Sequence, residues 1–525
     1  MFDRGRWPKH PETILAWLLV LGCVLWAYRF TPALGINCVD GWANVAGAKV
    51  ESLADVWGLV SSPLTMGVAG DNANFYRPTS MLWFGALRGV FGTWGAGWQG
   101  ASLLLHLCCV GLVAALARRL GGSRWEALAA GALLGLHPLG LDVVPAVDRS
   151  PDLLGSALVL GALLLGMKGR AVSAAILAIV ALGAKETMLA GMPVLVALLW
   201  DRHGPRRALY ALGLMAAFTA LYLIVRTQVL GGMGGYASST LRPQGLGNVL
   251  RAGALELLGA GWAEPLQAAF PSKIQQYLFG GMATFGLLGL AYAGRDEASV
   301  RLGFLLVLLP MLLLGLTAAF SRRTIYLPLT GFVLLVCAAI CRTPWGKGLG
   351  ILLAILLLPG SPLVRPDRAW SLAAKMDRSL TSGVVDQVAE LPEGAELWVV
   401  DRCIQVDIDP WMMGLWRGGQ GTAYCIATYS MEAYFEDQLG RPIAVHKVTN
   451  LFPERPPDTP ELTFEDGSIV LPRPAADRRI SRSAKDAGWQ VEDRDGVLRL
   501  TPGGNVDKAW VLVAGTEEGT LVKAP

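Results

Sequence analysis

Residues 171–200 read AVSAAILAIVALGAKETMLAGMPVLVALLW, and the only charged residues in this apolar stretch are Lys185 and Glu186. The charged pair leaves two arms of about 14 residues, and each arm would be about 20 Å long as a helix. The hydrocarbon core of a bilayer is about 30 Å thick, so neither arm can cross it unaided. The stretch therefore predicts a helical hairpin in a membrane, with its charged tip in a cavity lined by protein.

Apolar segments of helical length recur through the first two thirds of the chain. Of its 525 residues, 53% are hydrophobic and only 16% are charged, against roughly 25% in soluble domains. The sequence predicts eleven transmembrane helices, near residues 13–33, 96–117, 124–141, 152–167, 171–183, 187–200, 207–229, 274–293, 301–319, 324–341 and 347–363. The first has a long apolar run and no small-residue cleavage site after it, so we expect it to stay as an anchor.

Charge divides the chain near Pro366. Residues 1–365 contain 28 Lys and Arg against 16 Asp and Glu, whereas residues 366–525 contain 17 against 25. We therefore expect a transmembrane module at 1–365, with a first outer loop at 36–95, and a soluble α/β domain at 366–525. The predicted fold class is an α-helical polytopic membrane protein with a C-terminal soluble α/β domain. This organisation excludes a soluble enzyme, and the acidic second part does not favour a nucleic-acid binder.

Lys and Arg collect in alternate loops, which indicates the orientation of the chain. They are Arg4, Arg6, Lys9, Arg118, Arg119, Arg124, Lys168, Arg170, Arg202, Arg206, Arg207, Arg295, Arg301, Arg342 and Lys347. With eleven spans all of them fall on one side, so we expect the N-terminus in the cytoplasm and the 366–525 domain outside. An even number of spans would put that domain in the cytoplasm, and one basic loop would then have to change sides.

Many polar residues remain on the expected outer side. They are Asp40, Asp71, Tyr76, Arg77, His137, Asp142, Asp148, Arg149, Asp152, Lys185, Glu186, Arg226, Arg242, Arg322, Arg323 and Tyr326. A charge inside a span costs about 2.5–3.5 kcal/mol, so charges near span ends are functional candidates. The short apolar segment 79–92, which carries Arg88, is expected to lie on this side as an interfacial helix. Because these groups converge on one face, the sequence predicts a shared cavity at the outer membrane boundary.

Cations and carboxylates together suit an anionic phosphate and a base. Arg presents a fork of donors that matches phosphate oxygens, and it stays charged at any relevant pH. A carboxylate can accept a proton from an acceptor hydroxyl as a glycosidic bond forms. The expected substrate is therefore an amphiphilic phosphate with its tail in the bilayer and its head group at the outer face.

Several short motifs occur in the order and spacing of a known family. They are Asn37-Cys38-Val39-Asp40, Phe75-Tyr76-Arg77-Pro78, Leu103-Leu104-Leu105-His106-Leu107, Leu136-His137-Pro138, Asp152-Leu153-Leu154, Ala184-Lys185-Glu186 and Arg323-Thr324-Ile325-Tyr326-Leu327-Pro328. The series resembles the multi-span glycosyltransferases of the GT-C superfamily, above all the transmembrane O-mannosyltransferases with tetratricopeptide repeats and their bacterial relatives. No 34-residue period follows Pro366, and Val39 stands where the family often has a second acid. The mannose specificity of that branch is therefore not carried over.

The resemblance implies inverting transfer of a hexose or pentose from a polyprenyl-phosphate carrier to an acceptor hydroxyl at the outer face. Asp40 matches the first-loop acid that serves such enzymes as catalytic base. Tyr76, Arg77, His137, Lys185, Glu186, Arg323 and Tyr326 match substrate-binding motifs, and Asp71, Asp142, Arg149, Asp152 and Arg226 are further candidates. No cofactor is required, although Asp40 and Asp71 could share a divalent metal ion.

The main candidates also have structural interpretations. The role of Asp40 could be merely to cap the helix that follows it, and the role of His137 could be merely to end a helix. Lys185 and Glu186 could pair with each other. His106 lies among apolar neighbours and is expected to form interhelical hydrogen bonds.

The 366–525 domain is expected to combine helices and strands. Helical spacing covers 370–391, residues 411–437 are mixed or helical, and strands are expected at 395–401, 442–449, 461–471 and 508–514. Cys403 and Cys425 are candidates for a disulfide, because both are expected outside the cytoplasm. No catalytic motif occurs in this domain, so we expect it to cover the cavity or to select the acceptor.

The predicted function is that of a glycosyltransferase in a bacterial inner membrane. Its expected partners are a polyprenyl-phosphate sugar donor, an acceptor protein, lipid or polysaccharide, and membrane lipids, with no nucleic acid. A transporter or flippase of lipid-linked saccharide is the alternative, but the sequence lacks the internal repeat typical of transporters. In a second alternative, a noncatalytic scaffold, Asp40 and Arg323 could be replaced without effect.

Overall fold

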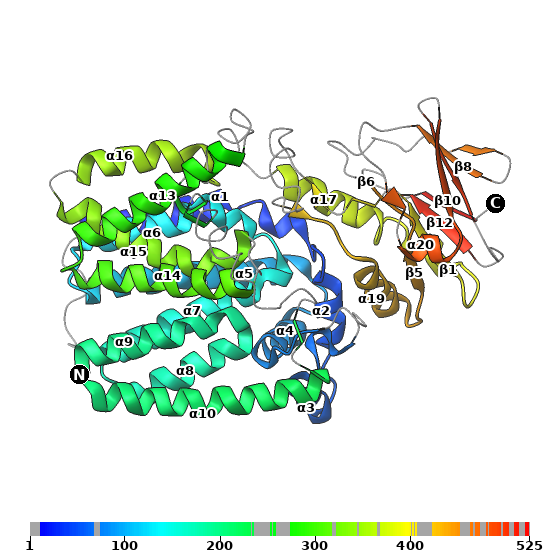
Figure 1. Cartoon of the computed structure of the whole chain (residues 1–525). Coiled ribbons are helices and arrows are strands. Elements are labelled where there is room, and N and C mark those ends of the chain that lie inside the picture. The colour runs from blue at the N-terminus through cyan, green and yellow to red at the C-terminus, as the bar shows by residue number, and fades with distance from the viewer. Residues whose placement is uncertain are drawn as a thin grey trace.

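The structure is a computed structural model (Figure 1). It describes residues 11–67, 74–232, 234–235, 253–254, 256–258, 273–317, 322–343, 346–364, 368–400, 402–403, 405–406, 423–451, 463–465, 468–472, 479–480, 482–494, 497–502, 509–513 and 520–523. Predictions made on other parts of the chain lie outside these residues, among them the site role of Asp71, the outer position of Arg242 and the cytoplasmic position of Arg4, Arg6 and Lys9.

A helix is found at each of the eleven positions where the sequence predicts a span. In chain order these are α1 (Pro11–Ala27), α5 (Gly95–Arg119), α6 (Arg124–Leu136), α7 (Ser150–Met167), α8 (Ala171–Ala184), α9 (Gly191–His203), α10 (Pro205–Leu230), α13 (Lys273–Ala293), α14 (Ala298–Thr317), α15 (Tyr326–Arg342) and α16 (Gly346–Leu357). Figure 1 shows them packed side by side as one bundle.

Length and composition separate these helices into two groups. Among the described residues, six segments are long and apolar enough to cross a membrane: Pro11–Leu34, Gly95–Arg119, Val147–Met167, Pro205–Leu230, Ala298–Leu316 and Arg322–Arg342. Shorter apolar helices occur at Ala171–Ala184, Gly280–Ala293 and Gly346–Leu357. The chain is therefore a polytopic helical membrane protein, and the count of eleven crossings stays a prediction.

Helix α15 is the most enclosed helix of the bundle, with every residue from Tyr326 to Ala339 buried. Its contact with α14 depends on two facing glycines. A Cβ atom on Gly303 would lie 2.6 Å from the carbonyl oxygen of Gly331, and one on Gly331 would lie 2.5 Å from that of Gly303. Only glycine allows the two backbones to approach so closely, as is common where membrane helices pack.

Helices α8 and α9 form the predicted hairpin. Helix α8 ends at Ala184, Lys185 is extended, and the 3₁₀ helix η6 (Glu186–Ala190) leads into α9. The tip lies against α7, where a Cβ atom on Gly155 would come within 2.6 Å of the Met188 side chain. This packing places the charged tip beside the N-terminal turn of α7.

The basic loops meet at one end of the bundle, as their alternation along the chain predicts. The ion pairs there are Arg124–Glu12 (3.0 Å), Arg342–Glu126 (2.9 Å), Arg342–Glu297 and Arg301–Asp201 (3.6 Å). The C-terminal part of the chain lies beyond the opposite end (Figure 1). Which end faces the cytoplasm stays a prediction.

Short helices cover the end of the bundle nearest the C-terminal part. They are η1 (Thr31–Leu34), α2 (Gly41–Gly47), α3 (Leu53–Ser61) and α4 (Pro78–Phe91). Helix α4 is the short helix expected at 79–92. The hydroxyl of Ser80 donates to the Ala184 carbonyl at 2.7 Å, and the hydroxyl of Thr79 donates to the Val180 carbonyl at 2.9 Å. These bonds attach the start of α4 to the end of α8.

The C-terminal part is a mixed α/β structure. Its helices are α17 (Arg368–Ser379), α18 (Val385–Ala389), α19 (Thr428–Leu439) and α20 (Arg482–Asp486). The first sheet has the order β13 (Thr520–Lys523), β12 (Ala509–Val513), β1 (Glu396–Val400), β5 (Ala444–Lys447), and β1 runs parallel to both of its neighbours. The second sheet is antiparallel, with the order β10 (Gln490–Arg494), β11 (Val497–Thr501), β8 (Ser468–Pro472), β7 (Thr463–Glu465).

Smaller strands complete this part. A three-stranded sheet has the order β2 (Arg402–Cys403), β6 (Thr449–Leu451), β9 (Arg479–Ile480), and β3 (Gln405–Val406) pairs with β4 (Ala423–Tyr424). The alternation of the central strand β1 explains its two cores, since successive side chains point to opposite faces. Leu397 and Val399 pack in the core that contains α19, whereas Trp398 and Val400 pack in a second core with Trp489.

Two predictions for this part were wrong in detail. The predicted helix 370–391 is two helices, because the chain turns after Ser379 and the Gly383 amide donates back to the Arg378 carbonyl at 2.8 Å. The predicted strand 461–471 is two antiparallel strands, β7 and β8. The predicted strands at 395–401, 442–449 and 508–514 are confirmed as β1, β5 and β12.

Candidate functional site

The tip of the α8–α9 hairpin holds two separate ion-pair groups. The Lys185 ammonium lies 2.5 Å from the Asp152 carboxylate at the start of α7, and both side chains are buried. The Glu186 carboxylate accepts from Arg77 at 2.9 Å and from Arg226 of α10 at 2.7 Å. The interpretation that Lys185 and Glu186 pair with each other is therefore wrong. Extended backbone at Lys185 sends the two neighbouring side chains to different partners.

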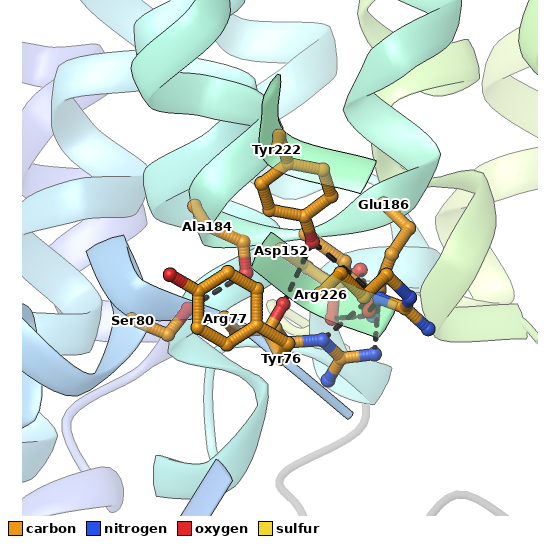
Figure 2. Close-up of polar contacts among 9 residues, drawn as sticks. Tyr76, Arg77, Ser80, Asp152, Ala184, Glu186, Tyr222 and Arg226 are labelled. Atoms are coloured by element: carbon orange, nitrogen blue, oxygen red, sulfur yellow. Dashed lines mark hydrogen bonds and ion pairs between the residues drawn. The ribbon is translucent and has the colours of Figure 1, made fainter. Parts of the chain in front are cut away.

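Two arginines share one carboxylate in the second group, so these three side chains have a net positive charge. Figure 2 shows Arg77 and Arg226 converging on Glu186. Burial would raise the pKa of Glu186, but the charges of Arg77 and Arg226 outweigh it and lower that pKa to about 2. Glu186 is therefore ionised at neutral pH, and it holds the two guanidinium groups together.

The same environment acts on Lys185. Burial lowers the pKa of Lys185 to about 8, although the Asp152 carboxylate opposes this shift. The positive charges of Arg323 and Arg77 contribute to the lowering. Several cations therefore lie close enough at this tip to repel one another, which is an arrangement suited to binding an anion.

Two tyrosines fix the backbone next to Arg77. The Tyr222 hydroxyl donates to the Tyr76 carbonyl at 2.7 Å, and the Tyr76 hydroxyl donates to the Val60 carbonyl at 2.7 Å. Their ring centroids are 5.5 Å apart. Pro78 then begins α4, a position at which proline is favoured because its nitrogen has no hydrogen to satisfy. The backbone on both sides of Arg77 is therefore fixed, and Figure 2 shows Arg77 next to Tyr76 and Tyr222.

Asp40 lies in the first loop, immediately before α2. Its backbone occupies the N-cap position, but its side chain makes no capping hydrogen bond. Its carboxylate oxygen Oδ1 instead accepts a hydrogen bond from the hydroxyl of Tyr429 in α19. Capping is therefore not the role of the Asp40 side chain.

The loop that carries Asp40 is held in a strained conformation. Cys38 has a φ of 75°, which is unfavourable for a residue with a side chain. The Asn37 side chain secures the loop by donating to the Pro145 carbonyl at 2.9 Å, and it accepts from Gln99 at 3.1 Å. Strain of this kind persists where surrounding contacts determine the conformation, and it is common at functional sites.

Charges around Asp40 come from several elements. Burial and the negative charge of Asp148 raise the pKa of Asp40, while the Tyr429 hydroxyl, Arg323 and Arg77 act in the opposite direction. The net shift is upward. A carboxylate with a raised pKa is a better proton acceptor than an ordinary one.

Arg323 acts on both the Asp40 carboxylate and the tip of the α8–α9 hairpin. It lies in the 3₁₀ helix η7 (Arg322–Ile325), and its charge acts on both Asp40 and Lys185. We call the following residues the charged cluster: Asp40, Arg77, Asp152, Lys185, Glu186, Arg226 and Arg323. The cluster lies at the end of the bundle nearest the C-terminal part, and it brings together seven of the sixteen residues that the sequence placed on the outer side.

Arg322 lies next to Arg323 but belongs to a separate group. Its guanidinium is 3.3 Å from Asp142 and 3.2 Å from Glu256. Burial raises the pKa of Asp142, against the charges of Arg322 and Arg149. Arg149 donates to the Asp142 carbonyl and lies over the Trp370 ring, with 5.2 Å from guanidinium carbon to ring centroid. The candidates Asp142 and Arg149 thus contact this group rather than Glu186 or Lys185.

Three further aromatic residues are engaged in packing. Both His137 ring nitrogens meet backbone groups, since Nδ1 accepts from Leu139 at 3.2 Å and Nε2 lies 3.1 Å from the Leu257 carbonyl. The Tyr326 hydroxyl lies 2.6 Å from Nδ1 of His106, whose Nε2 lies 3.3 Å from the Gly135 carbonyl. The interhelical role expected of His106 is confirmed. The geometry favours structural roles for His137 and Tyr326.

The predicted metal and disulfide sites each include a residue that the structure does not describe in full. Within the described ranges, no group of three His, Cys, Asp or Glu residues could hold a metal ion. The pairing of Asp40 with Asp71 falls outside those ranges, as does the side chain of Cys403, so the metal and disulfide predictions stay predictions.

The sequence analysis missed Tyr429. The only signal for it was the helical pattern within 411–437, which predicts a helix but not its contact with a loop 389 residues earlier. Asp148 was assigned to the outer side but not to the site, although its charge acts directly on Asp40.

Similarity to known proteins is found among solved structures, at low sequence identity. No protein-family model and no curated protein matches the sequence. The chain is similar to a solved structure of ArnT from Cupriavidus metallidurans bound to undecaprenyl phosphate, with 16% identity and a TM-score of 0.40, over 74% of this chain and 67% of ArnT. It is also similar to ArnT in the apo state, with 16% identity and a TM-score of 0.34, over 83% of this chain and 85% of ArnT.

Proposed function

We propose that this chain is an integral membrane glycosyltransferase of the GT-C type. It transfers a sugar from a polyprenyl-phosphate carrier to an acceptor hydroxyl at the outer face of the membrane. The observation that carries the proposal is the half-buried Asp40 carboxylate at the end of a membrane helix bundle, within electrostatic reach of Arg323 and Arg77. A base beside an anion-binding group is what such a transfer needs.

The proposed reaction is a single displacement. The acceptor hydroxyl gives its proton to Asp40 as its oxygen bonds to the anomeric carbon. The bond from that carbon to the carrier phosphate breaks, and its electron pair stays on the phosphate oxygen. Arg323, Arg77 and Lys185 stabilise the phosphate as its negative charge grows. The configuration at the anomeric carbon is inverted.

The setting of the reaction is part of the proposal. We assign residues 1–365 to the catalytic membrane module and residues 366–525 to an extracytoplasmic domain, with the N-terminus in the cytoplasm of a bacterial inner membrane. The positive charge of the loops at the far end of the bundle supports this orientation. Tyr76, Glu186 and Arg226 are proposed to position Arg77 rather than to touch the sugar.

Binding of undecaprenyl phosphate to purified protein tests the anion-binding part of the proposal. We expect Arg323→Ala to weaken this binding about 10- to 100-fold, because a hydrogen bond to a charged group is worth roughly 1.5–3 kcal/mol. Arg323→Lys should recover only part of the affinity, since Lys lacks the planar fork of donors. Native mass spectrometry of detergent-solubilised protein gives the affinities.

The control variant is Arg206→Ala, which removes one exposed positive charge from the opposite end of the bundle. It should bind undecaprenyl phosphate like the unmodified protein. Equal affinities for Arg323→Ala and Arg206→Ala would remove Arg323 from the site. Movement of a lipid-linked sugar across the membrane of vesicles that contain the protein, without cleavage of the sugar–phosphate bond, would instead favour the alternative function of a transporter or flippase.

A further inference from the structure

Helix α19 of the C-terminal part docks directly on the loop that carries Asp40. The Ala427 amide donates to the Val39 carbonyl at 3.2 Å, and the Ala43 amide of α2 donates to the Ser430 hydroxyl at 3.0 Å. The Tyr429 hydroxyl, between these two contacts in sequence, donates to Asp40. The start of α19 is thus bonded to the residue just before Asp40 and to α2 just after it.

Further contacts hold α19 in this position against the first loop and α4. The Trp42 and Tyr434 rings pack edge to face with centroids 4.7 Å apart, and Arg88 of α4 forms a 2.6 Å ion pair with Asp437. Both members of this ion pair are largely buried. These contacts orient α19 along its length, so the position of Tyr429 does not depend on its own hydrogen bond.

Helix α17 fixes the segment that leads into α19. The Asp377 carboxylate accepts from the Ile426 amide at 2.7 Å, and the Trp370 indole donates to the Leu141 carbonyl at 2.8 Å. Since Leu141 belongs to the membrane module, α17 connects both parts. Tyr429 is therefore held by a rigid frame built from two helices of the C-terminal part.

We propose that Tyr429 is a positioning residue for the catalytic base: the C-terminal domain supplies the hydroxyl that orients the Asp40 carboxylate and favours its ionised form. This inference rests on the proposed role of Asp40. One carboxylate oxygen, Oδ1, is occupied by the Tyr429 hydroxyl. The other, Oδ2, accepts no hydrogen bond from the part of the chain that the structure describes, which leaves it for the acceptor hydroxyl.

The groups that face Asp40 come from four elements in addition to its own loop. Asp148 of η5 (Val147–Arg149) favours the protonated form, whereas Arg77 before α4, Arg323 of η7 and Tyr429 of α19 favour the ionised form. A hydroxyl that donates to a carboxylate stabilises its charge. Tyr429 thus offsets part of the effect of burial and of Asp148 on the pKa of Asp40.

The test is a direct titration of Asp40 in the purified full-length protein by infrared difference spectroscopy. The carbonyl band of protonated Asp40 is identified by its disappearance in Asp40→Asn. In Tyr429→Phe this band should persist to a pH about one unit higher than in the unmodified protein, because the stabilising donor is lost. Replacing Tyr429 by 3-fluorotyrosine, a stronger donor, should move the titration to lower pH.

Ser430→Ala is the matched control, because it removes a neighbouring contact of α19 without touching Asp40. It should lower thermal stability without moving the Asp40 titration. An unchanged titration in both Tyr429→Phe and the fluorotyrosine protein would overturn the inference, and 3-fluorotyrosine keeps the test valid if Tyr429→Phe fails to fold.

Transfer activity separates this inference from the proposed function. Sugar transfer is measured with a labelled lipid-linked sugar fraction from the cells of origin. If Asp40→Asn transfers sugar normally, the base assignment fails and Tyr429 loses the role inferred here. If Asp40→Asn is inactive while Asp40 titrates at the same pH in the unmodified, Tyr429→Phe and fluorotyrosine proteins, the proposed function stands. Only the positioning role of Tyr429 then fails.

Discussion

The two ends of the helix bundle both contain ion pairs, but most of the exposed pairs lie at the basic end. At the basic end, the ion pairs Arg124–Glu12 and Arg301–Asp201 have side chains that are 37–52% exposed, whereas Arg342 and Glu126 are 20% and 2% exposed. At the charged cluster, Lys185 and Asp152 are only 8% and 3% exposed. Exposed pairs contribute little to stability, whereas a buried charge without a partner is expensive. We therefore expect breaking an exposed pair of the basic end to cost little stability and breaking the buried pair of the cluster to cost much.

The largest effect is expected at Asp40, and it bears on the chemistry of the cluster. Asn cannot accept a proton at neutral pH, but it can still accept the Tyr429 hydrogen bond, and the side chain does not cap α2. Asp40→Asn should therefore fold and bind undecaprenyl phosphate, while sugar transfer falls about 10²–10⁴-fold, the usual contribution of a general base. Transfer from a labelled lipid-linked sugar fraction measures the loss. Near-normal transfer would make another carboxylate, such as Asp148, the base.

The next effect is on stability at the buried pair. Lys185→Met leaves the Asp152 carboxylate buried without its partner, which should destabilise the protein by about 3–5 kcal/mol. The double variant Lys185→Met/Asp152→Leu removes both charges and should recover most of that loss. Thermal unfolding in detergent measures both. A single variant as stable as the double variant would show that this pair behaves like the exposed pairs.

A smaller effect on stability is expected when Glu186 is protonated at low pH. Its pKa in the folded protein is lowered to about 2, from an ordinary value of 4.5. The ionised group therefore stabilises the folded state above pH 4.5, and this contribution is lost as the pH falls from there towards 2. Glu186→Gln should be less stable than the unmodified protein at neutral pH, and the difference should shrink across that range. A constant difference across this range would mean that Arg77 and Arg226 do not depend on the charge of Glu186.

The smallest effect is expected at the basic end. Arg124→Ala should change the free energy of unfolding by at most about 1 kcal/mol, because its partner Glu12 is largely exposed. Addition of salt should reduce even this effect, since exposed charges are screened. A loss as large as that of Lys185→Met would erase the distinction between the two ends.

Local patterns in the sequence predicted much of this protein. Apolar runs gave helices at all eleven expected positions, because a helix in a bilayer depends mainly on the composition of its own segment. The α8–α9 hairpin followed from a charged pair that interrupts one such run. Predicted element boundaries were wrong where a local turn interrupts a periodic pattern. At Gly383, the chain turns within an otherwise helical pattern.

Most charged residues of the candidate site were predicted, but Tyr429 and the pairings were not. Charge and position along the chain indicated that Asp40, Arg77, Lys185 and Arg323 lie on one side. They did not indicate that Lys185 would pair with Asp152 rather than with Glu186.

What the sequence determined by itself is the helical membrane module, the alternation of its basic loops and the α/β character of the last 160 residues, because each depends on the composition of a local segment. Only the tertiary structure decided which charges meet and that Tyr429 reaches Asp40 across 389 residues. Such contacts depend on how helices pack and on which direction a backbone turn sends a side chain. No local pattern encodes either property, since both arise when distant segments bury their surfaces together.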